Sequence, residues 1–370
     1  MNRADTDGVD KPGPASQSSQ MYKSTQFWIV LFASFIHLSF LPDLSDFLYR
    51  NKPFPMRVQL AKEDFQKGIV LPLFALEEDY NYKQAIDEIA TLDARSVSFF
   101  VTNYQEDIRS NTIYLNRRVS EPLRLAEMID YAHHRGLSVF LFPTLHIQHL
   151  GDKEWRGVLQ PENPQEWWNS YFRMIRYYLS IARNHQVEMF SIGSELCANE
   201  QDYEQWSRII KYCRKNYDGL LTYSANWDHY SNITFIKDLD FFGMNAYFGL
   251  TSKDDPSLGE LIEAWKPAKE RIELAYKEYS KPILFTEIGY PSVDGTNAKP
   301  WNYFSTAKID LEEQALCYQA FVETWDPPPY YLHGVYFYNW WGTGGIGDRD
   351  YTPRDKPAES VLRRWYASLK

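Results

Sequence analysis

Two glutamates in this chain each follow an apolar run that has the character of a buried strand. Glu195 stands in "SIGSEL" and Glu287 in "KPILFTEIGYPS". Two carboxyl groups facing one site can cleave a glycosidic bond: the protonated one helps the leaving oxygen depart, and the ionised one attacks the sugar carbon or activates water. For either glutamate taken alone, an ion pair or a loop anchor is the simpler interpretation.

Eight short apolar runs could place these glutamates at strand ends. Runs that are apolar throughout are typical of strands covered on both faces. Eight of them separated by helical stretches predict a (β/α)8 TIM barrel over residues 66–370. An open doubly wound sheet is the alternative, but the first run lacks the G-x-G-x-x-G turn of that fold. The runs cover residues 68–76, 96–104, 137–147, 187–196, 219–227, 239–247, 281–290 and 334–341.

Several stretches between these runs repeat apolar residues at helical spacing. In one of them Ile86, Ile89 and Leu92 share a face, and another ends on Gly136, a typical helix stop. Helices are therefore predicted within residues 82–94, 121–136, 167–185 and 312–325.

In such a barrel, functional side chains gather at the carboxyl ends of the strands. The fourth and seventh runs carry the two glutamates and would lie across that end from one another. Polar and aromatic residues end most other runs, which barrel stability does not require. We therefore predict that Glu195 and Glu287 are catalytic. The predicted substrate-binding residues are Asn103, His146, Asn226, Trp227, Asn245, Tyr247, Trp340 and Trp341.

The composition favours an acidic enzyme with an uncharged substrate. The net charge is −10, which argues against a nucleic-acid partner because a phosphate backbone needs a basic footprint. The chain also holds 12 Trp, 27 Tyr and 22 Phe. Most of these rings will be core, but flat rings also suit the apolar faces of sugars.

We expect neither a metal nor a cofactor. Cys197, Cys213 and Cys317 are scattered, so they predict no disulfide framework and no zinc motif. His146 and His149 lack a third ligand of the usual kind nearby. The Gly-rich "GTGGIGD" lacks the Lys-Ser/Thr of a phosphate-binding loop.

The first 65 residues are predicted to precede the barrel. Residues 1–26 form a polar tail with a disordered composition, 27–42 a hydrophobic signal or anchor segment, and 43–65 a connector. The hydrophobic segment is short for a spanning helix but about right for the core of a signal peptide. We therefore expect an exported or membrane-anchored protein facing the periplasm or exterior. The alternative is an extra helix packed on a cytoplasmic protein. A start at Met21 would give a leading segment more usual for a signal peptide than the long polar tail.

Six segments together resemble glycoside hydrolase family 113: "SIGSEL", "LLTYSANWD", "LDFFGMNAYF", "KPILFTEIGYPS", "GVYFYNWW" and "GDRDYTPRDKPAE". The resemblance implies a retaining (β/α)8 glycosidase, in a group known mainly for β-mannanases. It implies that Glu195 is the acid/base and Glu287 the nucleophile. Tyr247 would hydrogen-bond the nucleophile, and Trp340 would form a sugar-stacking floor.

The expected function is therefore retaining hydrolysis of a β-linked polysaccharide or oligosaccharide, with endo-β-1,4-mannanase activity as the first candidate. Retention predicts carboxyl groups roughly 5–5.5 Å apart. Ser194 departs from the wider clan, where many enzymes have Asn before the acid/base. The alternatives are a non-catalytic, envelope-anchored carbohydrate-binding barrel and the same chemistry on an envelope glycan.

Overall fold

The computed structural model describes residues 64–74, 80–116, 122–231 and 233–369. The predicted polar tail, the hydrophobic segment and almost all of the connector lie outside these described residues. Within the described ranges, no helix is both long and apolar enough to cross a membrane.

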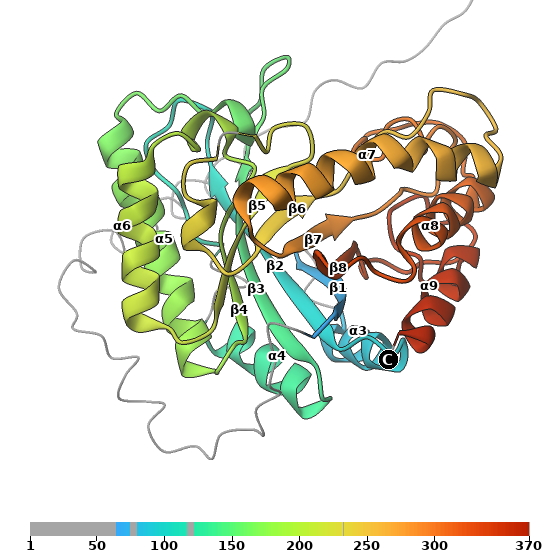
Figure 1. Cartoon of the computed structure of the whole chain (residues 1–370). Helices are drawn as coiled ribbons and strands as arrows, with labels where there is room; N and C mark the ends of the chain where they lie inside the picture. Colours follow the sequence, from blue (N-terminus) through green and yellow to red (C-terminus); the bar gives the residue numbers. More distant parts are fainter. Residues whose placement is uncertain (1–63, 75–79, 117–121, 232, 370) are drawn as a thin grey trace, which may run out of the picture. The chain divides into compact units, whose positions relative to one another are not determined.

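Eight parallel strands form a closed barrel in which each strand pairs with its neighbours in the sequence, and β8 pairs with β1 (Figure 1). All eight predicted runs are strands, and the predicted TIM barrel is confirmed. The strands are β1 (Gln66–Leu73), β2 (Ser96–Gln105), β3 (Ser138–Ile147), β4 (Met189–Ser194), β5 (Leu220–Asn226), β6 (Phe242–Asn245), β7 (Ile283–Ile288) and β8 (Leu332–Tyr338).

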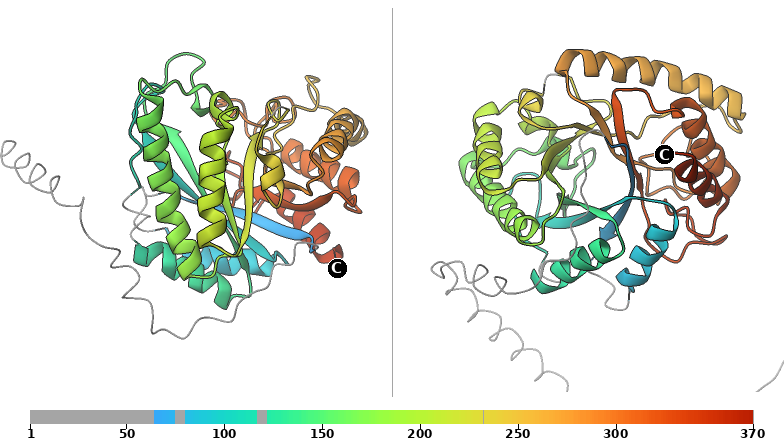
Figure 2. Two further views of the ribbon diagram at one scale, coloured as in Figure 1. Left: turned by 60° about the vertical axis from the view of Figure 1, so that its left-hand side comes forward. Right: turned by 60° about the horizontal axis from the view of Figure 1, so that its bottom comes forward.

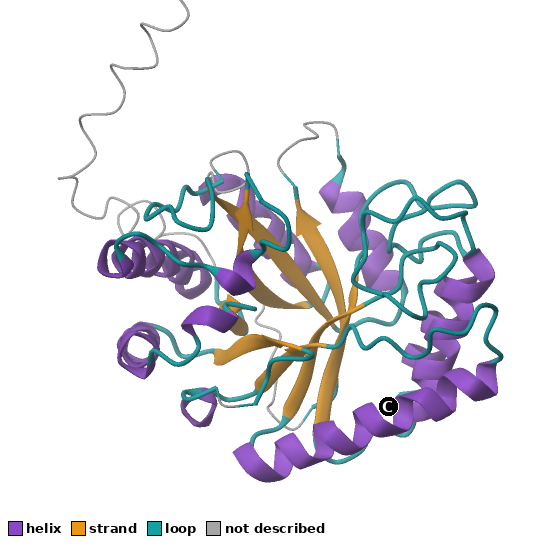
Figure 3. Ribbon diagram, turned by 90° about the horizontal axis from the view of Figure 1, so that it is seen from above, coloured by secondary structure: helices purple, strands orange, loops and turns teal. Residues whose placement is uncertain are grey.

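Helices surround the strands, as the view from above shows (Figure 3). The four predicted helical stretches are confirmed as α3, α4, α5 and α8. The helices are α3 (Tyr82–Thr91), α4 (Pro122–His134), α5 (Pro164–Asn184), α6 (Tyr203–Asn216), α7 (Leu258–Tyr279), α8 (Leu311–Trp325) and α9 (Pro357–Ser368). Short turns of 3₁₀ helix are η1 (Arg156–Val158), η2 (Cys197–Asn199) and η3 (Ile236–Asp238).

Side chains alternate between the two faces of the strands. In β1, Ile69 and Leu71 belong to the large core cluster, whereas Val70 between them belongs to a second cluster drawn from strands around the barrel. Successive strand residues point to opposite faces, so the second cluster fills the interior, as in other TIM barrels. Its buried members are Val70, Phe100, Phe140, Phe142, Met189, Phe241, Leu284 and Tyr336.

The pairing register is regular on one side of the barrel and irregular on the other. β2 and β3 pair without interruption from Ser96↔Ser138 to Gln105↔Ile147. The β4–β5, β6–β7 and β7–β8 pairs each contain a register shift. Because a bulge bends the strand and re-aims a side chain, these shifts alter which residues face the carboxyl-end opening, here called the mouth.

Candidate active site

Glu195 directly follows β4 and has a left-handed backbone, with φ of 54°. Such a conformation costs roughly 1–3 kcal/mol for a residue with a Cβ, and it persists where the surroundings fix it. Here the Glu195 N–H donates to the carbonyl oxygen of Ser224 on β5 at 2.9 Å. Its side chain is buried. Strain of this kind clusters at functional sites.

β7 presents Glu287 through an irregular register. Ile283 and Phe285 pack in the core cluster outside the barrel, so strict alternation would turn Glu287 the same way. The register shifts between Phe285 and Ile288, and Glu287 instead accepts a hydrogen bond at Oε2 from the Tyr247 hydroxyl at 3.0 Å. Among the described residues, its buried Oε1 has no hydrogen-bond partner.

Asn245, at the end of β6, links the two glutamates. Its Nδ2 donates to Oε1 of Glu195 at 2.7 Å, and its backbone pairs with that of Glu287. The Asn245 Oδ1 accepts hydrogen bonds from the hydroxyls of Ser224 and Thr286. The amide is therefore fixed from three strands, and the structure brings both predicted catalytic residues to one site.

Arg156, on η1 after β3, also contacts this site. Its guanidinium forms an ion pair with Oε2 of Glu195. It also lies close enough to Glu287 to favour the ionised form of that carboxyl. The prediction did not include Arg156, because it lies within a loop rather than at the end of an apolar run.

A group of tyrosines forms the wall beside Glu287. The Tyr247 ring lies 6.4 Å from that of Tyr338 and 6.1 Å from that of Tyr351, measured between centroids. Tyr338 and Tyr351 are 5.3 Å apart and nearly perpendicular. Tyr338 follows the interior residue Tyr336 by two positions in β8, so the alternation that fixes Tyr336 could have identified it.

The two carboxyl groups have different electrostatic surroundings. Burial, together with the negative charge of Glu195, raises the pKa of Glu287 to about 8, although Arg156 and the Tyr247 hydroxyl oppose this shift. Glu195, in contrast, is paired with a guanidinium. The raised pKa favours a proton on Glu287, whereas the resemblance implies that Glu287 is the ionised nucleophile during turnover.

Three other predicted binding residues, His146, Asn226 and Trp227, lie at or near strand ends. His146 is exposed, and its ring meets that of Tyr104 edge-on at 6.0 Å. Asn226 donates from Nδ2 to Asp228 at 2.7 Å. Trp227 stacks on Trp301 at 5.2 Å with an interplanar angle of 24°. Their roles in binding remain predictions.

Asn103 is not a binding residue in this structure, and that prediction is wrong. Its side chain has no exposed surface. The Oδ1 atom accepts a hydrogen bond from the hydroxyl of Tyr178 on α5 at 2.8 Å, and Nδ2 donates to the Thr144 carbonyl oxygen. Asn103 follows Phe99 and Val101 on the outward face of β2, so it connects the sheet to the helices.

The tryptophans after β8 also differ from expectation. Trp340 is 1% exposed, and its Nε1 donates to Glu88 on α3 at 2.9 Å. An enclosed ring cannot form the expected sugar-stacking floor, so that prediction is wrong. Trp341 is partly exposed and packs on Tyr80 at 4.2 Å and on Phe74 at 5.1 Å. The strand ends at Tyr338, and the chain then turns toward α3.

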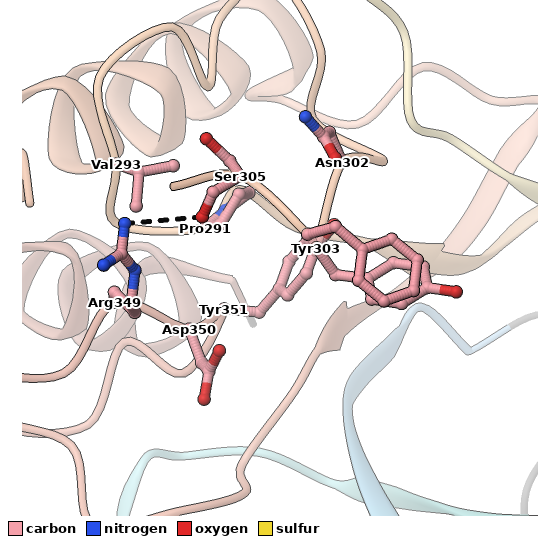
Figure 4. A pocket seen from close by; sticks show the side chains of 9 residues that line it. Pro291, Val293, Asn302, Tyr303, Ser305, Arg349, Asp350 and Tyr351 are labelled. Atoms are coloured by element: carbon pink, nitrogen blue, oxygen red, sulfur yellow. Dashed lines mark hydrogen bonds between the residues drawn. The ribbon is translucent and has the colours of Figure 1, made fainter. Parts of the chain in front are cut away.

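A cavity of about 100 Å³ lies beside the tyrosine wall, between the loops that follow β7 and β8 (Figure 4). Tyr351 and Tyr303 line it, and Arg349 donates to the Ser305 carbonyl oxygen at its edge. Tyr303 is also close enough to Arg156 and Tyr338 to act on them electrostatically. The cavity therefore adjoins the glutamate site.

In the described part of the chain, one group of side chains could hold a metal ion. Ligand atoms of Cys197, Glu200 and His229 lie within 4.8 Å of one another. The Glu200 carboxylate already accepts from the Tyr223 hydroxyl at 2.7 Å and pairs with His229 at 3.0 Å. These bonds satisfy the buried acid, as buried charges require, without an ion.

The chain matches the family model of Glycoside Hydrolase Family 113 over residues 73–356. It is 25% identical to a family 113 β-mannanase from Alicyclobacillus acidocaldarius, covering 83% of this chain and 98% of that one with a TM-score of 0.73. A second family 113 β-1,4-mannanase structure is 26% identical, with coverages of 82% and 99% and a TM-score of 0.73. No curated protein matches the sequence.

Two views of the ribbon (Figure 2) show the arrangement of strands and helices that these relatives share. A β-glucuronidase from Faecalibacterium prausnitzii is 14% identical, with a TM-score of 0.57, and the alignment covers 83% of this chain and 49% of that one. Likeness at that identity indicates a common barrel fold alone. It does not extend to the substrate, because one fold supports many substrates.

Proposed function

The chain belongs to glycoside hydrolase family 113, and from that membership we propose that it is a retaining β-1,4-mannanase. It is a glycoside hydrolase, and its substrate is a polysaccharide or oligosaccharide. Three family structures that are about a quarter identical to it are all described as β-mannanases. That likeness favours mannan over other β-linked glycans.

The proposed reaction is a double displacement. Glu287 attacks the anomeric carbon and forms a covalent glycosyl-enzyme, while Glu195 donates a proton to the leaving oxygen. Glu195 then takes a proton from the incoming water, which attacks the anomeric carbon and releases Glu287. Tyr247, which donates to Oε2 of Glu287, would keep the attacking carboxylate oriented.

The observation that carries this proposal is the link through Asn245. The Asn245 side-chain amide donates to Glu195, and the Asn245 backbone pairs with that of Glu287. This link supports a single site that uses both carboxyl groups. The two carboxyl groups also have different partners: Glu195 is paired with Arg156, whereas Glu287 accepts a hydrogen bond from Tyr247.

Chemical rescue tests the assignment of Glu287. We expect Glu287→Ala to lose turnover of β-mannan oligosaccharides, and added azide to restore it with a product of inverted configuration, because azide replaces the missing nucleophile. Glu263→Ala, which removes an exposed glutamate paired with Lys266, is the matched control and should retain activity. Loss of activity without azide rescue would argue against Glu287 as the nucleophile.

The substrate is tested by incubating the full chain with mannan, glucan and xylan oligosaccharides and resolving the products. We expect shortened mannan products only. Shortened products from another glycan alone would keep the chemistry and change the substrate. No product from any of them would favour the carbohydrate-binding alternative.

A further inference from the structure

Arg156 is a cation placed directly on the proposed acid/base. Its side chain is 24% exposed and that of its partner Glu195 10%, so the ion pair is largely removed from water. Arg156 also acts electrostatically on Glu287, Tyr303 and His146. Its Nε is buried and, within the described residues, has no hydrogen-bond partner.

This ion pair opposes the role proposed for Glu195. A general acid must carry a proton when the leaving oxygen departs, whereas an adjacent guanidinium favours the ionised carboxylate. Asn245 adds a second donor at Oε1, which also favours the ionised form. Both contacts therefore oppose the protonated form that a general acid needs.

We propose that Arg156 is a positioning residue that holds Glu195 ionised in the free enzyme and transfers its hydrogen bonds to substrate hydroxyls when the site fills. The inference rests on the proposed function. In the free site Glu287 carries the proton. When sugar hydroxyls take the guanidinium, the proton passes from Glu287 to Glu195, and Glu287 becomes the ionised nucleophile. The proton is conserved, and Arg156 keeps its charge.

The position of Arg156 suits such a movement. It begins the single turn η1, while the backbone that follows is anchored by bonds from Gln160 N to the Ile108 carbonyl oxygen and from Glu162 N to that of Arg109. A long side chain can therefore swing without displacing the loop. The Arg156 Nε has no hydrogen-bond partner among the described residues, and a sugar hydroxyl would satisfy it.

The other titratable groups around the pair do not replace this cation. Glu195 interacts electrostatically with Glu287 on β7. It also interacts with Cys197 and Glu200, which lie in the turn after β4. These neighbours are acidic and oppose ionisation of Glu195. Removing the positive charge of Arg156 should therefore raise the pH at which Glu195 ionises.

Arg156→Gln and Arg156→Lys in the full chain test this, with an aryl β-mannoside and mannotetraose as substrates. The acid limb of kcat/KM reports the free enzyme. We expect it to move upward by about one pH unit or more in Arg156→Gln, as for loss of an adjacent opposite charge, and to stay near wild type in Arg156→Lys. Arg135→Gln, which removes a surface ion pair with Asp87, is the control.

An unmoved acid limb in a folded Arg156→Gln variant would overturn the proposal. If the wild type cleaves neither glycoside, the proposed function fails, and the role of Arg156 is then tested without turnover. In ¹³C NMR of glutamate-labelled protein, the signal missing from Glu195→Gln identifies the Glu195 carboxyl. It should titrate at lower pH in wild type than in Arg156→Gln, and equal titration would contradict the inference.

Discussion

The two sides of the barrel differ in strand register, and the difference separates packing residues from site residues. β2 and β3 pair without a shift, and the polar residue Asn103 near the end of β2 bonds outward to α5. β4 to β7 contain shifts next to Glu195, Asn245 and Glu287, which meet at the mouth. A polar residue at a strand end is thus a weak signal until its face of the sheet is known.

The largest expected effect concerns Glu195, on the side of the barrel that contains the register shifts. Glu195→Ala should lower kcat on mannan oligosaccharides by about 10²–10⁴-fold, the usual contribution of a general acid. Aryl mannosides with good leaving groups should lose much less in the first step, because they need little proton donation. Rates across a series of leaving groups measure this, and an equal loss on every substrate would contradict the acid/base role.

Asn245→Ala should have the next largest effect. It removes the amide that donates to Glu195, and hydrogen bonds to charged groups contribute about 1.5–3 kcal/mol, so kcat/KM should fall about 10–100-fold. Asn245→Asp is the companion variant, since it keeps the shape and removes the donor. Activity near that of wild type in both would mean that Asn245 does not orient the acid/base.

Asn103→Ala tests the side of the barrel without register shifts, and it is the counterpart of Asn245→Ala on the other side. Its loss leaves the Tyr178 hydroxyl without its buried partner, so unfolding free energy should fall by about 1–3 kcal/mol while kcat/KM stays unchanged. Denaturant unfolding and steady-state kinetics measure the two quantities. A fall in kcat/KM of the size seen for Asn245→Ala would remove the distinction between the two sides.

The last prediction concerns stability against pH. Because the pKa of Glu287 is raised to about 8 from its ordinary 4.5, the folded state binds a proton that the unfolded state releases above pH 4.5. This stabilising contribution is present at low pH and declines between about pH 4.5 and 8. The Tm advantage of Glu287→Gln over wild type should grow across that window. A constant difference would contradict the raised pKa.

Much of the fold could be predicted from the sequence, because each strand is a run apolar on both faces and each such run needs a covering helix. The two glutamates were predictable for the same reason, as charged residues that end such runs. The alternation of faces in β2 also predicts that Asn103 points outward with Phe99 and Val101, toward the helices rather than the mouth.

Other parts of the site could not be predicted from periodicity. The register shift that turns Glu287 inward depends on how β7 pairs with β8, a contact between separate segments. Arg156 reaches Glu195 from a loop, where no apolar pattern fixes its direction. Trp340 looked like a strand end, but β8 ends at Tyr338, and the next residues turn to meet α3.

The most direct measurement of the central claim is the trapping of a covalent glycosyl-enzyme. Incubation of wild type with a 2-deoxy-2-fluoro-mannosyl fluoride, followed by proteolysis and peptide mass spectrometry, should locate the sugar on Glu287. Glu195→Ala should still be labelled there, because the fluoride leaving group needs little proton donation. A label on any other residue, or continued turnover by a Glu287→Ala variant, would contradict the claim that these two carboxyl groups perform a double displacement.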